Sequence, residues 1–161
     1  MSTAMASRPA PPHARLLPAR DAFDYDHFRE RLADPALADA GVAVALFRIP
    51  LLAVPVGGDR RGGYSSFGQL VDAVQARTLL SAVPGFPDLR IRWSPYSNTC
   101  HTVEWGEPSP PWWADNEVMG RFYGYSAHAI AAFVQGRSQI PSAFSGPCFL
   151  TAQRARQGGE Q

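Results

Sequence analysis

Lysine is missing from the sequence, and all fifteen basic residues are arginine. A lysine Schiff base, a P-loop lysine and a lysine general base are therefore excluded from any mechanism. Positive and negative side chains nearly cancel, leaving a formal net charge of +1 at pH 7. Because so small a charge produces no strong overall field, the composition disfavours bulk attachment to nucleic acid or to a membrane surface.

Cysteine is scarce as well. Cys100 and Cys148 are the only two, and they lie far apart without forming a C-x-x-C pair. This spacing predicts neither a disulfide framework nor a structural zinc site, and we expect reduced thiols. No spacing of histidine, cysteine and carboxylate residues matches a metal site, and no cofactor motif is present. We therefore predict no metal and no cofactor.

Long apolar runs are also absent. The apolar segment 42–47 is far too short to span a bilayer, and the N-terminal region has no continuous apolar stretch of the kind found in signal peptides. These absences predict a soluble, cytoplasmic protein that makes no contact with a membrane.

The length of 161 residues and the 45% hydrophobic content suit one domain with one sizeable core. Residues 1–20 are rich in proline and alanine and are predicted to be a disordered tail. Residues 21–150 are predicted to form the single domain. Residues 151–161 are predicted to be a flexible C-terminal tail.

The hydrophobic pattern predicts alternating groups of helices and strands. Helices are expected from Asp21 to Asp34, over 66–82, from Asp115, and from a Ser126 cap to Gly136; strands are expected over 42–47, 51–56, 89–94 and 100–105. The segment 42–47 is apolar at odd and even positions alike, which predicts a strand that is covered on both faces or central in its sheet. The helix over 66–82 is expected to bury a stripe of Phe67, Leu70, Val71 and Val74.

This order predicts an α+β domain with a four-stranded, mainly antiparallel sheet, in the sequence helix, strand, strand, helix, strand, strand, helix, helix. The last two strands are predicted to form a hairpin. Its alternation pairs Leu89, Ile91 and Trp93 with Trp105, Val103 and His101 on the covered face. It also pairs Arg90 with Glu104 and Arg92 with Thr102 on the exposed face.

The strongest candidate site is the glycine-bracketed double arginine over 57–66, placed between a predicted strand and a predicted helix. Its candidate ligand-binding residues are Arg60, Arg61, Gly58, Gly62 and Tyr64. Backbone amides of a glycine-rich turn and two guanidinium groups can converge on a phosphate or carboxylate. The alternative interpretation is a solvated loop in which Asp59 neutralises one arginine and the glycines supply positive φ. The Walker A and dinucleotide-binding motifs are both absent.

Two other functions remain open. A small enzyme could use His101, Cys100 and Glu104, although strand alternation places His101 on the opposite face from the other two. A nucleic-acid-associated protein could use Arg60, Arg61, Arg90 and Arg92 as a basic strip. The aromatic residues at 112–113 and 122–125 could stack on bases or anchor an interface, but they are interpreted first as core.

Four segments are distinctive in combination: 51–58 (LLAVPVGG), 92–96 (RWSPY), 100–107 (CHTVEWGE) and 121–126 (RFYGYS). Together they resemble a small actinobacterial family of unknown function, of streptomycete type, over roughly residues 21–134. The resemblance implies no activity, ligand or catalytic residue. From the residues themselves we expect a binding or regulatory protein that engages an anionic small molecule or an acidic protein partner near the loop, and no catalytic residue is assigned.

Overall fold

The computed structural model describes residues 14–46, 49–96, 99–111 and 113–136. The first half of the fold comprises β1 (Arg15–Pro18), the 3₁₀ helix η1 (Ala19–Asp21), α1 (Tyr25–Arg31), α2 (Ala36–Asp39), β2 (Val42–Ala45) and β3 (Leu51–Ala53). The second half comprises β4 (Gly62–Phe67), α3 (Leu70–Ser81), β5 (Arg90–Arg92), β6 (His101–Gly106), α4 (Asn116–Phe122) and α5 (Ala127–Val134).

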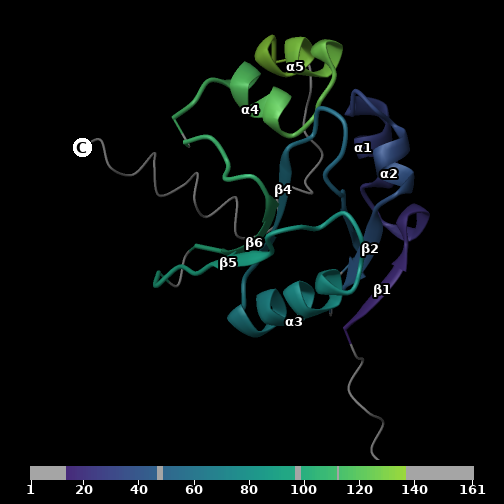
Figure 1. Ribbon diagram of the computed structural model, residues 1–161. Coiled ribbons are helices and arrows are strands. Elements are labelled where there is room, and N and C mark those ends of the chain that lie inside the picture. Colours follow the sequence, from purple (N-terminus) through teal and green to yellow (C-terminus); the bar gives the residue numbers. More distant parts are fainter. Residues whose placement is uncertain (1–13, 47–48, 97–98, 112, 137–161) are drawn as a thin grey trace, which may run out of the picture.

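The strands form two antiparallel sheets of three strands each, with the orders β1-β2-β3 and β4-β6-β5 (Figure 1). The α+β class is confirmed, but the prediction of one four-stranded sheet is wrong. Two strands were missing from the prediction: β1 falls in the expected tail, and β4 falls in the expected loop. Strand β1 pairs with β2 and strand β4 pairs with β6, so each of them adds a third strand to one of the two sheets.

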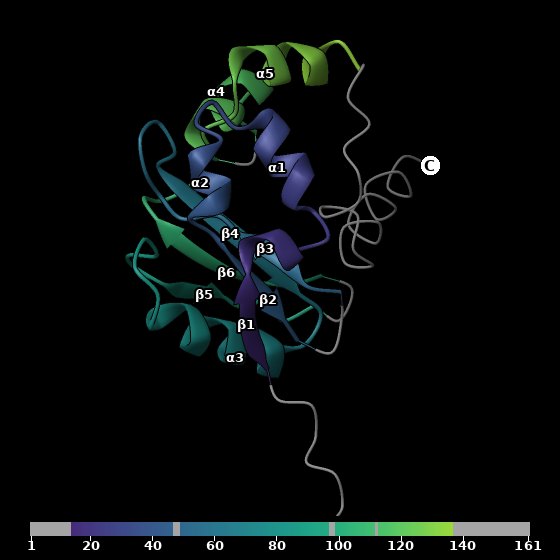
Figure 2. The same cartoon turned by 90° about the vertical axis from the view of Figure 1, so that its right-hand side faces the viewer.

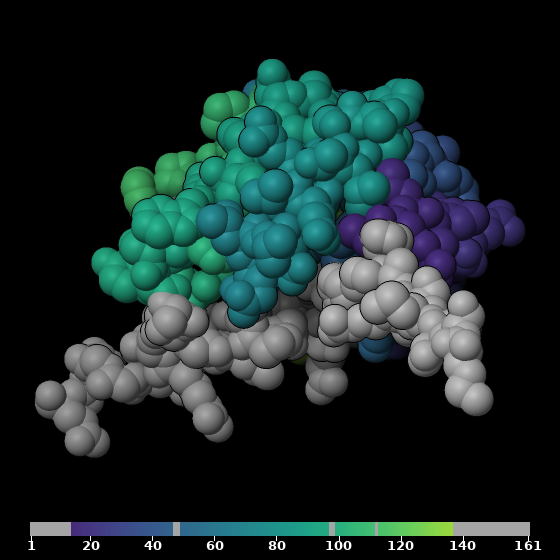
Figure 3. Space-filling view, turned by 90° about the horizontal axis from the view of Figure 1, so that it is seen from below, coloured from purple at the N-terminus to yellow at the C-terminus, as the bar shows by residue number. Residues whose placement is uncertain are grey.

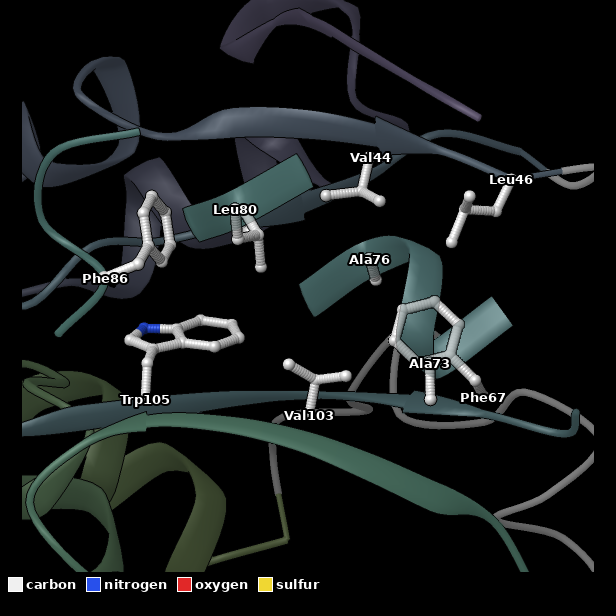
Figure 4. Close-up of a cluster of buried hydrophobic side chains, with 10 residues drawn as sticks. Val44, Leu46, Phe67, Ala73, Ala76, Leu80, Phe86, Val103 and Trp105 are labelled. Atoms are coloured by element: carbon white, nitrogen blue, oxygen red, sulfur yellow. The ribbon is translucent and has the colours of Figure 1, made fainter. Parts of the chain in front are cut away.

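The main hydrophobic core lies between the sheets. Val44 and Leu46 extend from the β2 side toward Val103 and Trp105 of β6, and α3 closes the core with Ala73, Ala76 and Leu80 (Figure 4). The rings of Trp105 and Phe86 pack edge to face, with centroids 5.2 Å apart. Burying these apolar surfaces is the dominant force that holds the two sheets together.

A second core lies on the other face of the first sheet, where α1 and α2 cover it (Figure 2). Ala43 faces this second core, while its neighbour Val44 faces the main core. The prediction that this strand is covered on both faces is therefore confirmed. The helix predicted from Asp21 to Asp34 is shorter, since α1 ends at Arg31 and α2 begins after Pro35.

The N-terminal boundary of the fold lies earlier than predicted. Leu16 packs against the main core and Leu17 against the second core, because β1 pairs with β2 along its whole length. Pro18 is tolerated at the end of this edge strand, where its missing donor costs little. The expectation of a disordered tail extending to Arg20 is thus wrong for the residues from Arg15 onward, and residues 1–13 and 151–161 lie outside the described residues.

Helix α3 buries a different face from the predicted stripe. Its buried residues are Ala73, Ala76 and Leu80, whereas Leu70, Val71 and Val74 are exposed. Figure 3 views the molecule from the side on which α3 lies. Alanines allow the helix to approach the sheets closely, so the small side chains occupy the interface and the larger branched ones remain outside. The N-cap of α3 is Gln69, and its side chain makes no capping bond.

Strand β4 is the main difference from the predicted order. Residues 62–67 pair with β6 along their full length, so the glycine-rich segment is a short turn followed by a strand. A Cβ atom at Gly63 would lie 2.6 Å from the indole of Trp105, so no larger residue fits there. Gly62 and Gly63 are therefore required for close packing. From the sequence alone, a glycine needed for close packing looks the same as a glycine in a flexible loop.

The C-terminal half follows the predictions closely. The register of β5 and β6 pairs Arg90, Ile91 and Arg92 with Glu104, Val103 and Thr102 in that order, as predicted. The side chains of Asp115 and Ser126 cap α4 and α5 by accepting backbone bonds from Val118 and Ala129. Trp93, expected on the covered face, is instead 60% exposed, because β5 ends at Arg92 and the chain turns away.

Candidate functional site

Arg60 is buried, although the sequence predicted it in a loop as a candidate ligand-binding residue. It ends a tight turn in which the amides and carbonyls of Gly57 and Arg60 bond reciprocally, and only 5% of its surface is exposed. Its Nη1 donates to the carbonyl of Tyr123 at 2.6 Å, and its Nε donates to the carbonyl of Val54 at 3.4 Å. The side chain thus ties the end of α4 to the chain that leaves β3, and we assign Arg60 a structural role.

Three tyrosines surround this guanidinium: Tyr64, Tyr123 and Tyr125. The Cζ of Arg60 lies 5.9 Å from the centroid of the Tyr123 ring, within range of a cation–π contact. Burial lowers the pKa of the Arg60 guanidinium and raises the pKa of Tyr123 to about 12. No carboxylate among the described residues forms an ion pair with Arg60, so this buried group carries an unbalanced positive charge.

The remaining predicted site residues do not converge on one point. The Arg61 side chain is 62% exposed and pairs with Glu107 at 2.6 Å. Gly58 lies exposed at the tip of the turn with a φ of +52°, while Gly62 is buried against the ring of Phe122. Tyr64 lies on β4, where its ring contacts that of Tyr123 with centroids 5.4 Å apart. The turn therefore does not present two adjacent arginines to solvent.

Polar side chains gather instead on the face of the second sheet that points away from the main core. We call this surface the outer face and define it by Tyr64, Ser66, Arg90, Arg92, Thr102 and Glu104. At its centre Glu104 is buried, with its carboxylate 3.2 Å from Nε of Arg90 and 3.3 Å from Nε of Arg92. The predicted pairing of Arg90 with Glu104 is confirmed, but the expectation that this pair is exposed is wrong for Glu104.

The two arginines on the outer face differ in their freedom to bind anything else. Arg90 also donates to the carbonyls of Asp88, Gly106 and Glu107, so its donors are largely used within the protein. The side chain of Arg92 is 68% exposed, and Glu104 is its one ion-pair partner among the described residues. Arg92 is therefore the cation of this face with donors available to an external group.

The residues of the enzyme hypothesis are not brought together. His101 lies on the core side of β6, and its Nδ1 accepts a hydrogen bond from the backbone of Ser94 at 3.2 Å. Glu104 points to the outer face and is held by its two arginines. Cys100 is disulfide-bonded, so the expectation of a reduced thiol is wrong for it; Cys148 lies outside the described residues. His101, Cys100 and Glu104 thus do not form a nucleophile and base pair.

The basic strip that a nucleic-acid function requires is also not formed. Arg60 is buried, and Arg61 and Arg90 bond to the Glu107 side chain and backbone respectively. Among the aromatic residues, Phe122 is buried as expected, whereas Trp113 is exposed; Trp112 lies outside the described residues. Sequence reading missed the partnership of Arg60 with Tyr123, because no local pattern links residues so far apart in the chain.

Comparison with known proteins identifies the family but no activity. The model of the family of unknown function DUF6302 matches residues 16–153, so the chain belongs to that family. No curated protein and no solved structure matches it. Within the part of the chain that the structure describes, no helix is long and apolar enough to cross a membrane, and no cluster of three potential metal ligands occurs.

Proposed function

We propose that this protein is a binding module whose partner presents acidic groups to the outer face of the second sheet. The observation that carries the proposal is the arrangement of two arginines around one buried carboxylate, with Arg92 still largely exposed. The proposal keeps the expected anionic or acidic partner and moves the contact from the turn at Arg60 to the sheet.

Local charge balance supports an acidic partner. Arg90 and Arg92 share the single carboxylate of Glu104, and Arg60 behind β4 adds a further positive charge without an acidic partner among the described residues. Because the carboxylate of Glu104 fixes Arg92 at one side, its guanidinium is oriented before a ligand arrives. A preoriented guanidinium loses less side-chain entropy on binding, and it can accept a carboxylate or phosphate with two hydrogen bonds.

The test compares Arg92 with an arginine on the opposite side of the sheet. Arg92→Gln and the matched control Arg77→Gln, an exposed position on α3, are titrated with poly-glutamate, inorganic phosphate and a short single-stranded oligonucleotide. We expect wild type and Arg77→Gln to bind poly-glutamate, and Arg92→Gln to bind it about tenfold or more weakly, with binding that decreases as salt increases.

Thermal unfolding of both variants serves as the control for folding. Since Arg92 is mostly exposed, its replacement is expected to change stability by less than about 1 kcal/mol. If no acidic probe binds, or if Arg92→Gln binds every probe as well as Arg77→Gln does, the proposed function is wrong. Preferential binding of the oligonucleotide would indicate a nucleic-acid partner instead.

A further inference from the structure

We propose that the outer edge of β5 receives an extended acidic segment of a partner protein as an additional strand of the second sheet. The inference rests on the proposed function and specifies the form of the partner. It follows from three features of β5: an edge that no described strand pairs with, two arginines on one face, and exposed aromatic residues after the strand.

The first feature is the open edge. In the order β4-β6-β5, strand β5 pairs with β6 on one side, and no described strand pairs with its other side. An edge strand presents unpaired backbone donors and acceptors, which an incoming strand can satisfy. The opposite edge strand, β4, contacts β3 of the first sheet, so it is less accessible to a partner.

The second feature is the pattern of side chains along β5. Arg90 and Arg92 point to the outer face, while Ile91 between them faces the core and is only half-buried. In an added strand, side chains alternate in the same way, so acidic residues two positions apart would lie beside the arginines with an apolar residue between them. Asp88 is exposed near the start of β5. Because its carboxylate would repel acidic side chains of the partner segment there, we expect those side chains to lie nearer to Arg92.

The third feature is the aromatic pair beyond the strand. Trp93 is 60% exposed and Tyr96 is 69% exposed, and both follow β5 before the chain returns as β6. Tryptophan, tyrosine and arginine are the residue types that most often dominate the binding energy at protein interfaces. A partner strand that continues past Arg92 would cover these rings.

A second copy of this chain is a poorer occupant. Pairing β5 with another β5 would bring two pairs of arginines side by side, and like charges on neighbouring strands are destabilising. An acidic segment has the opposite effect, because it supplies the carboxylates that the shared Glu104 does not provide.

The experiment uses labelled peptides of about ten residues in which glutamate and valine alternate. In one peptide the glutamate amides are N-methylated, and in another the valine amides are N-methylated. Only one set of amides can point toward β5 in an added strand, so we expect one methylated peptide to bind about tenfold or more weakly while the other binds like the unmodified peptide. Arg92→Gln and Trp93→Ala should weaken binding of the unmodified peptide, and Arg77→Gln should not.

The outcomes separate this inference from the proposed function. If both methylated peptides bind as well as the unmodified one, the edge inference is wrong while the proposed acidic partner stands. The same holds if poly-glutamate binds through Arg92 but the alternating peptide does not bind. If neither poly-glutamate nor the peptide binds, both proposals are wrong. A dimer that forms through β5 without any peptide would also overturn the inference.

Discussion

The guanidinium of Arg60 bonds two carbonyls from different parts of the chain and contacts an aromatic ring, so removing it affects more than one element. We predict that Arg60→Ala lowers the free energy of unfolding by about 2–4 kcal/mol, because it removes the guanidinium donor to the carbonyl of Tyr123, one of the two donors to the carbonyl of Val54, and the packing of the side chain. Arg61→Ala at the neighbouring exposed position should cost less than about 1 kcal/mol. Urea unfolding of both variants provides the measurement, and equal costs would contradict the structural role of Arg60.

His27 is a second residue whose burial has a measurable effect. Its Nδ1 is buried without a hydrogen-bond partner among the described residues, and burial, together with the nearby charge of Arg31, lowers its pKa to about 4. Because the ordinary value is 6.5, the unfolded chain binds a proton at this position below pH 6.5 while the folded chain does so only near pH 4. The folded state therefore loses stability as the pH falls through that window.

We predict that His27→Gln reduces this acid sensitivity. Between pH 7 and pH 4 the wild type should lose about 2 kcal/mol more than the variant, since other titrating groups contribute equally to both. Urea unfolding at several pH values measures the difference. Parallel stability curves for the two proteins would show that folding does not lower the pKa of His27.

At the scale of elements, β1 is the segment whose contribution is easiest to isolate. It provides Leu16 to the main core and Leu17 to the second core, and it completes the first sheet. A variant that begins at residue 14 retains every described element, whereas one that begins at residue 21 lacks β1 and most of η1. We expect the first to melt within a few degrees of the full chain and the second to melt at least about 10 °C lower, because it exposes both cores.

Elements with a clear local signal could be predicted from the sequence. Strict alternation from Leu89 onward and the capping residues Asp115 and Ser126 placed the hairpin and the last two helices correctly. The strand β4 could not be found in this way, because Gly62 and Gly63 occupy it for reasons of close packing against Phe122 and Trp105. The orientation of α3 was missed for a related reason, since its buried face is made of alanines that carry little hydrophobic signal.

The candidate site shows the same limit. The pairing of Arg90 and Glu104 follows from the register of two neighbouring strands, so the sequence predicted it. The burial of Glu104 and Arg60 depends on residues distant in the chain, among them Tyr123 at the end of α4. Local pattern carries no information about such contacts, whereas the exposure of Arg92 follows from the alternation of side chains along β5.

At the scale of the whole molecule, the carbonyl of Val54 is a junction between the two sheets. It accepts a bond from the indole Nε1 of Trp105 at 3.0 Å and another from Nε of Arg60 at 3.4 Å. Val54 follows β3 of the first sheet, and Trp105 belongs to β6 of the second. One acceptor thus links the first sheet, the second sheet and the turn before β4.

We predict that Trp105→Phe and Arg60→Ala are not additive. Trp105→Phe alone should cost about 1–3 kcal/mol, and the double variant should differ from the sum of the single effects by at least about 0.5 kcal/mol, because the two side chains share one acceptor. Urea unfolding of the four proteins in the cycle measures the coupling. Strict additivity would show that the carbonyl of Val54 does not connect the two donors energetically.

The contrast between Trp105, which is 1% exposed, and Trp93 has a practical consequence for spectroscopy. The indole of Trp105 emits from an apolar interior, and its emission should shift to longer wavelength only when the sheets separate. The indole of Trp93 emits from water and should shift to shorter wavelength when a strand covers it. The sequence has four tryptophans. In a variant in which Trp112 and Trp113 are replaced by phenylalanine, the two remaining indoles therefore report global unfolding and occupation of the β5 edge by fluorescence changes of opposite direction.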